Sequence, residues 1–212
     1  MGIEVKQFIW DYIDSNMYVI RHGTSALIID PIECEEAELM LCDLNKIIIL
    51  LTHEHFDHIC GLNQIRKSFG CKVIAQAECS KNIQNSKKNL SAYANTLMCL
   101  TGESHKKPVS PFICESADLT FNDNFSFEWE GNTVCIFSTP GHSPGSACIS
   151  IKNMLFSGDT ILQSKPIYRL PGGDRAKYKS ITIPKIHEIL NRETIVYPGH
   201  GTIIPATSIA WL

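Results

Sequence analysis

An unbroken aliphatic run followed at once by histidines and an aspartate constrains this 212-residue chain more than any other feature. The run, residues 47–51, predicts a strand at 46–51, because continuous apolar sequences of this length are typical of strands buried on both faces. The next residues are Thr52-His53-Glu54-His55-Phe56-Asp57-His58, so four potential metal ligands lie within six residues. The pattern predicts a central strand that ends in a metal site.

The spacing within this motif predicts how its ligands divide. In extended backbone, side chains two residues apart point the same way, so His53 and His55 can bind one ion. A turn into the next helix then moves Asp57 and His58 toward a neighbouring position. The motif alone therefore suggests two adjacent binding positions.

Three further candidate ligands lie far along the chain, each at the end of a strand-like run. They are His142, Asp159 and His200, and a glycine stands beside each of them. Strand ends of one sheet meet along one edge, where α/β proteins place ligands. Imidazole and carboxylate suit zinc, iron or manganese, and these segments contain no cysteine for a closed structural zinc site.

Other residues near these patterns are interpreted as structural. A lone histidine at a strand end is usually hydrogen-bonded or solvated, and we assign His22, His105 and His187 to that class. Glu54 and Phe56 alternate with the ligands and point away from them, so we expect them to support the ligands and to pack.

Apolar and polar patterns predict a layered α/β fold in which helices cover the sheets. Strands are expected at residues 5–10, 17–21, 26–29, 46–51, 72–77, 126–129, 134–138, 147–151, 154–156 and 194–197, and helices at 33–44, 57–69 and 185–190. Residues 79–111 are rich in Asn, Lys and Ser, with one short amphipathic helix near Leu90 and Leu97. We interpret that segment as a connector or lid, and more simply as a solvated excursion joining the two halves.

Composition excludes several classes of protein. The chain is 44% apolar and only 19% charged, which is unlike a disordered protein. A net charge of −3 without a long basic run does not favour nucleic-acid or anionic-membrane binding, and Lys81, Lys87, Lys88, Lys106 and Lys107 are only a weak indication of it. No apolar run approaches the ~20 residues that span a bilayer.

Nine cysteines without a C-x-x-C pair predict free thiols and a cytoplasmic protein, and the length predicts one domain over 1–212.

Five motifs together resemble the metallo-β-lactamase superfamily, especially its glyoxalase II-like hydrolases. They are HxHxDH at 53–58, TPGHSPGS at 139–146, SGDT at 157–160, LPGGD at 170–174 and YPGHG at 197–201. The resemblance implies an αββα sandwich, two mixed β-sheets covered by helices, with a site for two divalent metal ions. It assigns His53, His55 and His142 to one ion, Asp57, His58 and His200 to the other, and Asp159 as the bridge.

The resemblance also implies a function, that of a dinuclear metal-dependent hydrolase. A hydroxide bridging the metals would attack a small thioester or ester, and Asp57 would orient it or pass on its proton. Two ions, most simply zinc, with iron or manganese as alternatives, would lower the pKa of the shared water. The positive site favours a small anionic substrate, which Arg169 or Lys165 could contact.

Departures from the family pattern keep other activities open. True glyoxalase II enzymes carry a further C-terminal helical region that helps to hold glutathione, whereas this chain stops twelve residues after His200. The β-lactamases usually have Cys or Ser in place of Asp159, and the homoserine-lactone hydrolases have Tyr in place of Leu162. The alternatives are a mononuclear iron persulfide dioxygenase-like enzyme, a phosphodiesterase or nuclease, and a non-catalytic metal-binding module.

Overall fold

The computed structural model describes residues 2–101, 108–164 and 166–211, and within them the strands form two six-stranded sheets. The first sheet contains, in spatial order, β1 (Glu4–Trp10), β2 (Ser15–His22), β3 (Ser25–Ile29), β4 (Lys46–Leu50), β5 (Lys72–Gln76) and β6 (Leu119–Phe121). The second contains β12 (Ile204–Pro205), β11 (Ile195–Pro198), β10 (Met154–Gly158), β9 (Ala147–Ile151), β8 (Asn132–Ser138) and β7 (Asn124–Trp129).

Both sheets are mixed. In the first, β1, β2 and β3 form an antiparallel meander, and β3 to β6 then run parallel. In the second, β7 to β10 are antiparallel, and β11 is parallel to β10. Parallel strands need crossover connections, which helices supply here. The ends of β4 and of its parallel neighbours therefore lie at one edge of the sheet.

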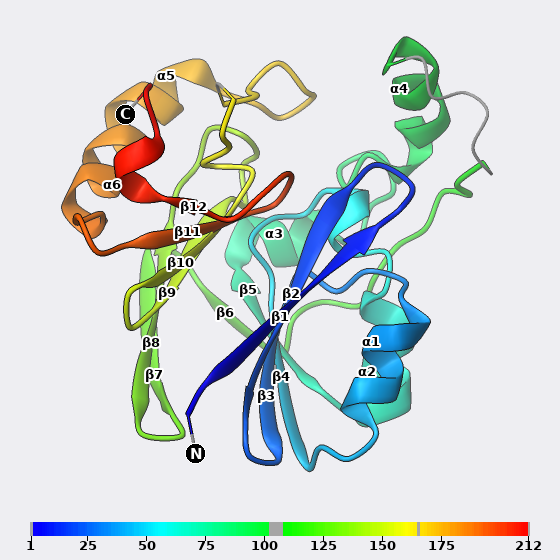
Figure 1. Ribbon diagram of the computed structural model, residues 1–212. Coiled ribbons are helices and arrows are strands. Elements are labelled where there is room, and N and C mark those ends of the chain that lie inside the picture. The colour runs from blue at the N-terminus through cyan, green and yellow to red at the C-terminus, as the bar shows by residue number, and fades with distance from the viewer. Residues whose placement is uncertain (1, 102–107, 165, 212) are drawn as a thin grey trace.

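Helices cover the outer face of each sheet (Figure 1). The first sheet carries α1 (Glu35–Leu41), α2 (Leu62–Phe69) and α3 (Ala77–Asn82), followed in sequence by α4 (Ala94–Thr101), and the second carries α5 (Arg175–Lys177) and α6 (Ile183–Ile189). Within the described residues, no helix is both long enough and apolar enough to cross a membrane. The predicted fold class, an αββα sandwich, is confirmed.

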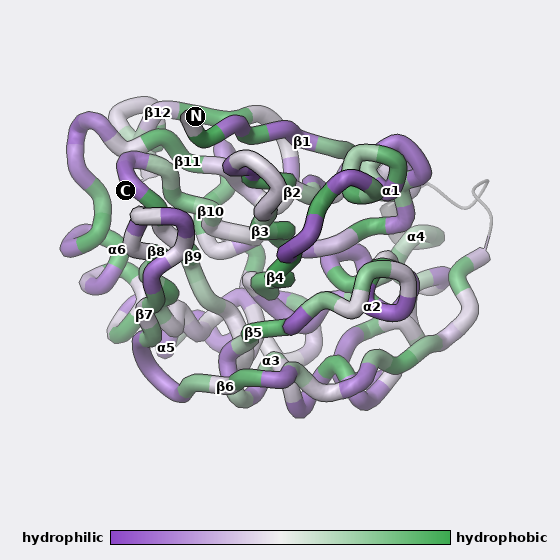
Figure 2. The backbone as a smooth tube through the Cα atoms, turned by 90° about the horizontal axis from the view of Figure 1, so that it is seen from below, coloured by the Kyte–Doolittle hydropathy of each residue, from purple (hydrophilic) through white to green (hydrophobic). Residues whose placement is uncertain are grey.

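Strand alternation divides the core into layers. In β2, Met17 and Val19 pack beneath the helices, whereas Tyr18 and Ile20 pack between the two sheets. This is the period of two that a strand imposes on its side chains. Strands β3 and β4 are buried on both faces, and Figure 2 shows them as a hydrophobic band inside the molecule.

The predicted helix at 57–69 is divided in the structure. Residues Phe56–His58 form a short 3-10 turn, and α2 begins only at Leu62. Between them Gly61 passes so close to Ile32 that a Cβ would lie 2.2 Å from the Ile32 carbonyl oxygen. The turn and this close approach leave the metal-binding motif outside the regular helix.

The interpretation of residues 79–111 as a solvated excursion is wrong for much of the segment. Ile83, Leu90, Ala94 and Met98 are buried in the core beneath the helices of the first sheet. The sequence analysis did not predict the short elements α3, β6 and β12. Runs of two to six residues show too little hydrophobic periodicity to indicate a helix or a strand. His105, Lys106 and Lys107 lie outside the described residues.

Candidate metal centre

Strand ends from both sheets bring the seven predicted ligands into one small volume. The segment after β4 supplies four of them, and the loops after β8, β10 and β11 supply one each: His53, His55, Asp57, His58, His142, Asp159 and His200. Six are buried, and the His200 side chain keeps 26% of its surface exposed. The seven residues predicted as ligands therefore lie together in the structure.

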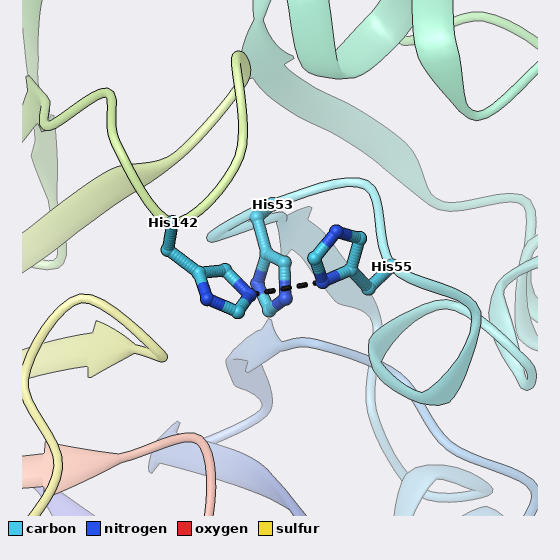
Figure 3. A group of neighbouring side chains, drawn as sticks. All are labelled: His53, His55 and His142. Atoms are coloured by element: carbon cyan, nitrogen blue, oxygen red, sulfur yellow. Dashed lines mark hydrogen bonds between the residues drawn. The ribbon is translucent and has the colours of Figure 1, made fainter. Parts of the chain in front are cut away.

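His53, His55 and His142 form the first group of potential ligands (Figure 3). Their ring nitrogens lie within 4.8 Å of one another. His142 Nε2 is 2.9 Å from His55 Nδ1, although these histidines are 87 residues apart in sequence. Figure 3 shows that the three rings come from separate points of the backbone and converge.

Asp57, His58 and His200 form the second group. Asp57 Oδ2 lies 3.1 Å from His58 Nε2 and 3.2 Å from His200 Nε2, and the two nitrogens are 3.3 Å apart. Two ligands about 2.1 Å from a tetrahedral zinc ion would be separated by roughly 3.4 Å. The three atoms thus have the mutual spacing of a tetrahedral ligand face.

Asp159 lies between the groups. Its Oδ2 is 3.5 Å from His142 Nε2 of the first group and 3.6 Å from His200 Nε2 of the second, and its Oδ1 is 3.6 Å from His58 Nε2. The Asp159 carboxylate can occupy this place because residue 199 is a glycine. A Cβ at Gly199 would lie 2.2 Å from Asp159 Oδ1. One carboxylate can therefore face both groups at once.

Sequence reasoning missed a buried aspartate, Asp30, that orients two of the histidines. Its carboxylate accepts hydrogen bonds from the Thr52 amide and hydroxyl, and the Thr52 oxygen lies 3.0 Å from His53 Nδ1. Asp30 Oδ2 is also 3.3 Å from His58 Nδ1. Because each Nδ1 faces an oxygen, the Nε2 of both rings is left to act as a ligand. Asp30 directly follows β3, so the strand-end argument could have found it.

His142 is oriented by the backbone. Its Nδ1 lies 2.6 Å from the carbonyl oxygen of Ile167, which can only accept a hydrogen bond. The Nδ1 therefore carries the proton, and Nε2 presents a lone pair toward His55 and Asp159. Ile167 belongs to the segment between β10 and α5, so this segment positions a candidate ligand.

Four buried side-chain atoms at the centre have no hydrogen-bond partner in the described part of the chain. They are His53 Nε2, His55 Nε2, His58 Nδ1 and Asp159 Oδ1. Leaving such atoms unpaired costs about 1–3 kcal/mol each, and a bound cation satisfies the two Nε2 atoms and Asp159 Oδ1. Neutral imidazoles and carboxylates are also the donor set that zinc, iron and manganese accept. The residues present therefore fit a divalent metal centre.

Burial and neighbouring charges shift the pKa values of the histidines in opposite directions in the two groups. Burial, reinforced by neighbouring imidazoles, lowers the pKa of His53 well below its usual value and that of His55 to about 3. Burial would also lower the pKa of His58, but Asp57 and Asp159 raise it well above its usual value. Burial would raise the pKa of Asp57, but His58 holds it well below. His53 and His55 are therefore neutral, whereas Asp57 and His58 form an ion pair.

Glu54 is buried beside the ligands without belonging to either group. Its carboxylate accepts hydrogen bonds from Asn82 Nδ2 at 2.8 Å, Ser143 Oγ at 2.7 Å and the Gly145 amide at 3.2 Å. It thereby connects the motif after β4 to α3 and to the loop that carries His142. This agrees with the supporting role expected from its alternation with the ligands.

The remaining predicted residues belong to neither group of potential ligands or lie outside the described chain. His22 contacts the ring of Trp129, and His187 is exposed on α6. Arg169 is exposed in the segment between β10 and α5. Lys165 falls outside the described residues, so its role stays a prediction.

Comparisons with known proteins agree with this architecture. The family model of the metallo-beta-lactamase superfamily matches residues 10–200. A probable metallo-hydrolase of Bacillus subtilis is 32% identical over 201 residues, covering 89% of this chain and 86% of that protein. The crystal structure of the B3 metallo-beta-lactamase BLEG-1 superposes with a TM-score of 0.80 and 31% identity, covering 97% of this chain and 95% of that chain.

A hydroxyacylglutathione hydrolase of Shewanella halifaxensis is more distant, with 25% identity over 168 residues. The match covers 79% of this chain but only 51% of that enzyme. The family model, the two-sheet architecture and the clustered motif residues agree on one assignment. The chain belongs to the metallo-beta-lactamase superfamily.

Proposed function

We propose that this protein is a hydrolase that uses two divalent metal ions to cleave a small thioester or ester. One observation carries the proposal: two groups of three potential ligands face each other across a shared carboxylate, Asp159. A single-ion site needs only one such group. The name of the Bacillus subtilis relative, a probable metallo-hydrolase, supports the same class of reaction.

The two groups divide the ions between them. His53, His55 and His142 would hold one ion, and Asp57, His58 and His200 the other, with Asp159 contacting both. Zinc is the first choice, with iron or manganese accepted by the same donors. Two bound ions acidify a water molecule and polarise the attacked carbonyl group.

The chain itself contributes orientation and proton handling. Asp57 Oδ2 lies 3.1 Å from His58 Nε2 and 3.2 Å from His200 Nε2, and we assign to Asp57 the proton that the attacking water gives up. Asp30 and Thr52 keep the imidazole protons on the Nδ1 atoms, away from the ions. Two divalent ions outweigh the charges of Asp57 and Asp159, so the site favours a small anionic substrate, which Arg169 could contact.

We assign the reaction class, cleavage of a thioester or ester, and do not assign specificity for glutathione thioesters. The hydroxyacylglutathione hydrolase supports thioester cleavage by its name, yet the chain spans about half of that enzyme. β-Lactam hydrolysis is the second candidate, because the B3 metallo-beta-lactamase BLEG-1 covers nearly the whole chain at 31% identity. The β-lactamases of the superfamily usually have Cys or Ser at the position of Asp159. The carboxylate at this position therefore favours thioester or ester cleavage over β-lactam hydrolysis.

Metal analysis combined with a substrate panel tests the proposal. Protein loaded with zinc, iron or manganese should hold about two ions per chain and hydrolyse at least one thioester or ester in preference to a β-lactam. Fewer than one ion per chain under replete conditions would contradict it. Oxygen uptake with glutathione persulfide, without ester or thioester cleavage, would instead support the mononuclear iron enzyme.

A further inference from the structure

A cavity of about 380 Å³ lies beside α3, the segment that follows it, and the two loops that carry His53, His55 and His142. Lys87, Lys88 and Tyr93 line one part of it, and Pro144 and Glu54 line another. Glu54 stands between the ligands His53 and His55, and Pro144 is two residues from the ligand His142. The cavity, here called the Lys87–Lys88 pocket, therefore shares its walls with two ligand-bearing loops.

Positive charge exceeds negative charge among the side chains that line this pocket. Lys87 and Lys88 are both exposed, and neither forms an ion pair with any residue in the described ranges. Glu54 also lines the pocket and offsets one of the two positive charges, but its buried carboxylate is held by Asn82, Ser143 and Gly145, so the pocket keeps a net positive charge. In a chain of net charge −3, two free ammonium groups beside a cavity form a local anion-attracting site.

The loop that carries the lysines is fixed relative to the metal-binding motif. Asn85 Oδ1 accepts hydrogen bonds from the amides of Lys87 at 3.0 Å and Lys88 at 3.3 Å. The carbonyl oxygen of the buried Asn89 accepts a hydrogen bond of 2.8 Å from the amide of Phe56, which lies between the ligands His55 and Asp57. The lysine backbone is thus preorganised, which reduces the entropic cost of binding.

The pocket has apolar as well as charged walls, because Tyr93 and Pro144 line it together with the lysines. The Tyr93 side chain remains 41% exposed at the cavity, and Pro144 packs close to Gly172, where a Cβ would lie 3.1 Å from the proline ring. Aromatic and proline surfaces suit the uncharged stem of a ligand, and ammonium groups suit its charged end. The pocket therefore matches an extended molecule with an anionic end.

We propose that the Lys87–Lys88 pocket binds a carboxylate or phosphate at the non-reacting end of the substrate, so that the ester or thioester carbonyl lies at the metal centre. The second half of this statement rests on the proposed hydrolase function. Binding itself requires only the two ammonium groups and the fixed loop. The pocket thus determines which substrates the general hydrolytic site accepts.

Titration calorimetry with unreactive probes tests the binding. S-methylglutathione offers carboxylates, S-methyl coenzyme A offers phosphates, and neither has a free thiol to bind metal. At least one should bind the metal-loaded protein, and Lys87→Gln with Lys88→Gln should raise its Kd at least about tenfold. Lys81→Gln is the matched control, since Lys81 is exposed on α3 and pairs with Glu78 at 3.6 Å, and it should leave the Kd unchanged. If neither probe binds, or the double variant binds equally well, the proposal is overturned.

Steady-state kinetics separates this proposal from the hydrolase assignment. For an anionic thioester, the double variant should raise KM at least about tenfold with kcat nearly unchanged, and for a neutral thioester it should change neither. Thioester cleavage with an unchanged KM in the double variant would overturn the pocket and leave the hydrolase intact. Lysine-dependent probe binding without cleavage of any ester or thioester would overturn the hydrolase and leave the pocket intact.

Discussion

Asp30 and Thr52 show how residues outside the ligand set determine the chemistry of a metal centre. Thr52 Oγ1 lies 3.0 Å from His53 Nδ1 and Asp30 Oδ2 lies 3.3 Å from His58 Nδ1, so an oxygen faces each Nδ1 and both rings present Nε2. An imidazole that turned or changed tautomer would be a weaker ligand. The orientation of these histidines thus depends on a carboxylate outside the seven predicted ligands.

Replacing Asp30 by Asn is expected to weaken metal binding about 10- to 100-fold, the usual effect of losing a carboxylate that orients ligating histidines. Competition with a chromogenic chelator measures the change. Asp43→Asn is the control, because Asp43 is an exposed aspartate paired with Arg21. Equal affinities in the two variants would show that Asp30 does not orient the ligands.

Replacing Asp57 by Asn should lower kcat at least about 100-fold on any substrate that the wild type cleaves, because the variant loses the group that takes up the proton. Metal content is measured on the same samples. A variant that keeps its metal and its full kcat would refute the catalytic role of Asp57. Such a result would leave Asp57 as a ligand only.

The seven candidate ligands could be picked out from the sequence, whereas the role of Asp30 in orienting two of them could not. His142, Asp159 and His200 follow strands, and glycines mark the turns that bring them together. Asp30 also follows a strand, yet its role depends on its hydrogen bonds with Thr52 and its approach to His58. Those contacts follow from the register of β3 against β4, which local sequence does not specify.

At the scale of elements, the loop after β8 depends on Glu54. This carboxylate joins Ser143 and Gly145 of that loop to Asn82 of α3. The sequence pattern could assign Glu54 to the opposite side from the ligands but could not name its partners. The short helix α3 was itself missed, because six residues give too weak a signal.

Glu54→Ala should reduce the free energy of unfolding by about 1–3 kcal/mol, since three buried donors lose their acceptor. Glu54→Gln keeps one acceptor oxygen, so its loss should be smaller. Urea unfolding of the metal-free protein measures both, with Glu78→Ala on α3 as an exposed control. If the alanine variant were as stable as the control, Glu54 would not stabilise this junction.

At the scale of the whole molecule, the candidate metal centre lies where hydrogen bonds connect the two sheets. The Asn16 amide of β2 donates to the Gly199 carbonyl oxygen at 2.7 Å, and the Ala147 amide of β9 donates to the Thr52 carbonyl oxygen at 2.7 Å. Each bond connects one sheet to a ligand-bearing segment of the other. Ligands from both sheets would then be held by the same ions.

Removing the metal should therefore lower the stability of the entire fold. Free ion at about 100 times its Kd contributes about 2.7 kcal/mol, and in a chain of this size each kcal/mol shifts Tm by about 2–4 °C. Chelator treatment is expected to lower Tm by at least about 5 °C, and added zinc should restore it. A Tm that does not respond to chelator would mean that no ion joins the sheets.

X-ray absorption spectroscopy of the metal-loaded protein tests the central claim most directly, because it detects whether one ion has another beside it. If the seven residues hold a pair of ions around Asp159, the spectrum should show a metal–metal distance of about 3.5–4 Å. His200→Ala, which removes a ligand of the second group, should reduce that signal. A fully loaded wild-type protein with no metal–metal scattering would contradict the account.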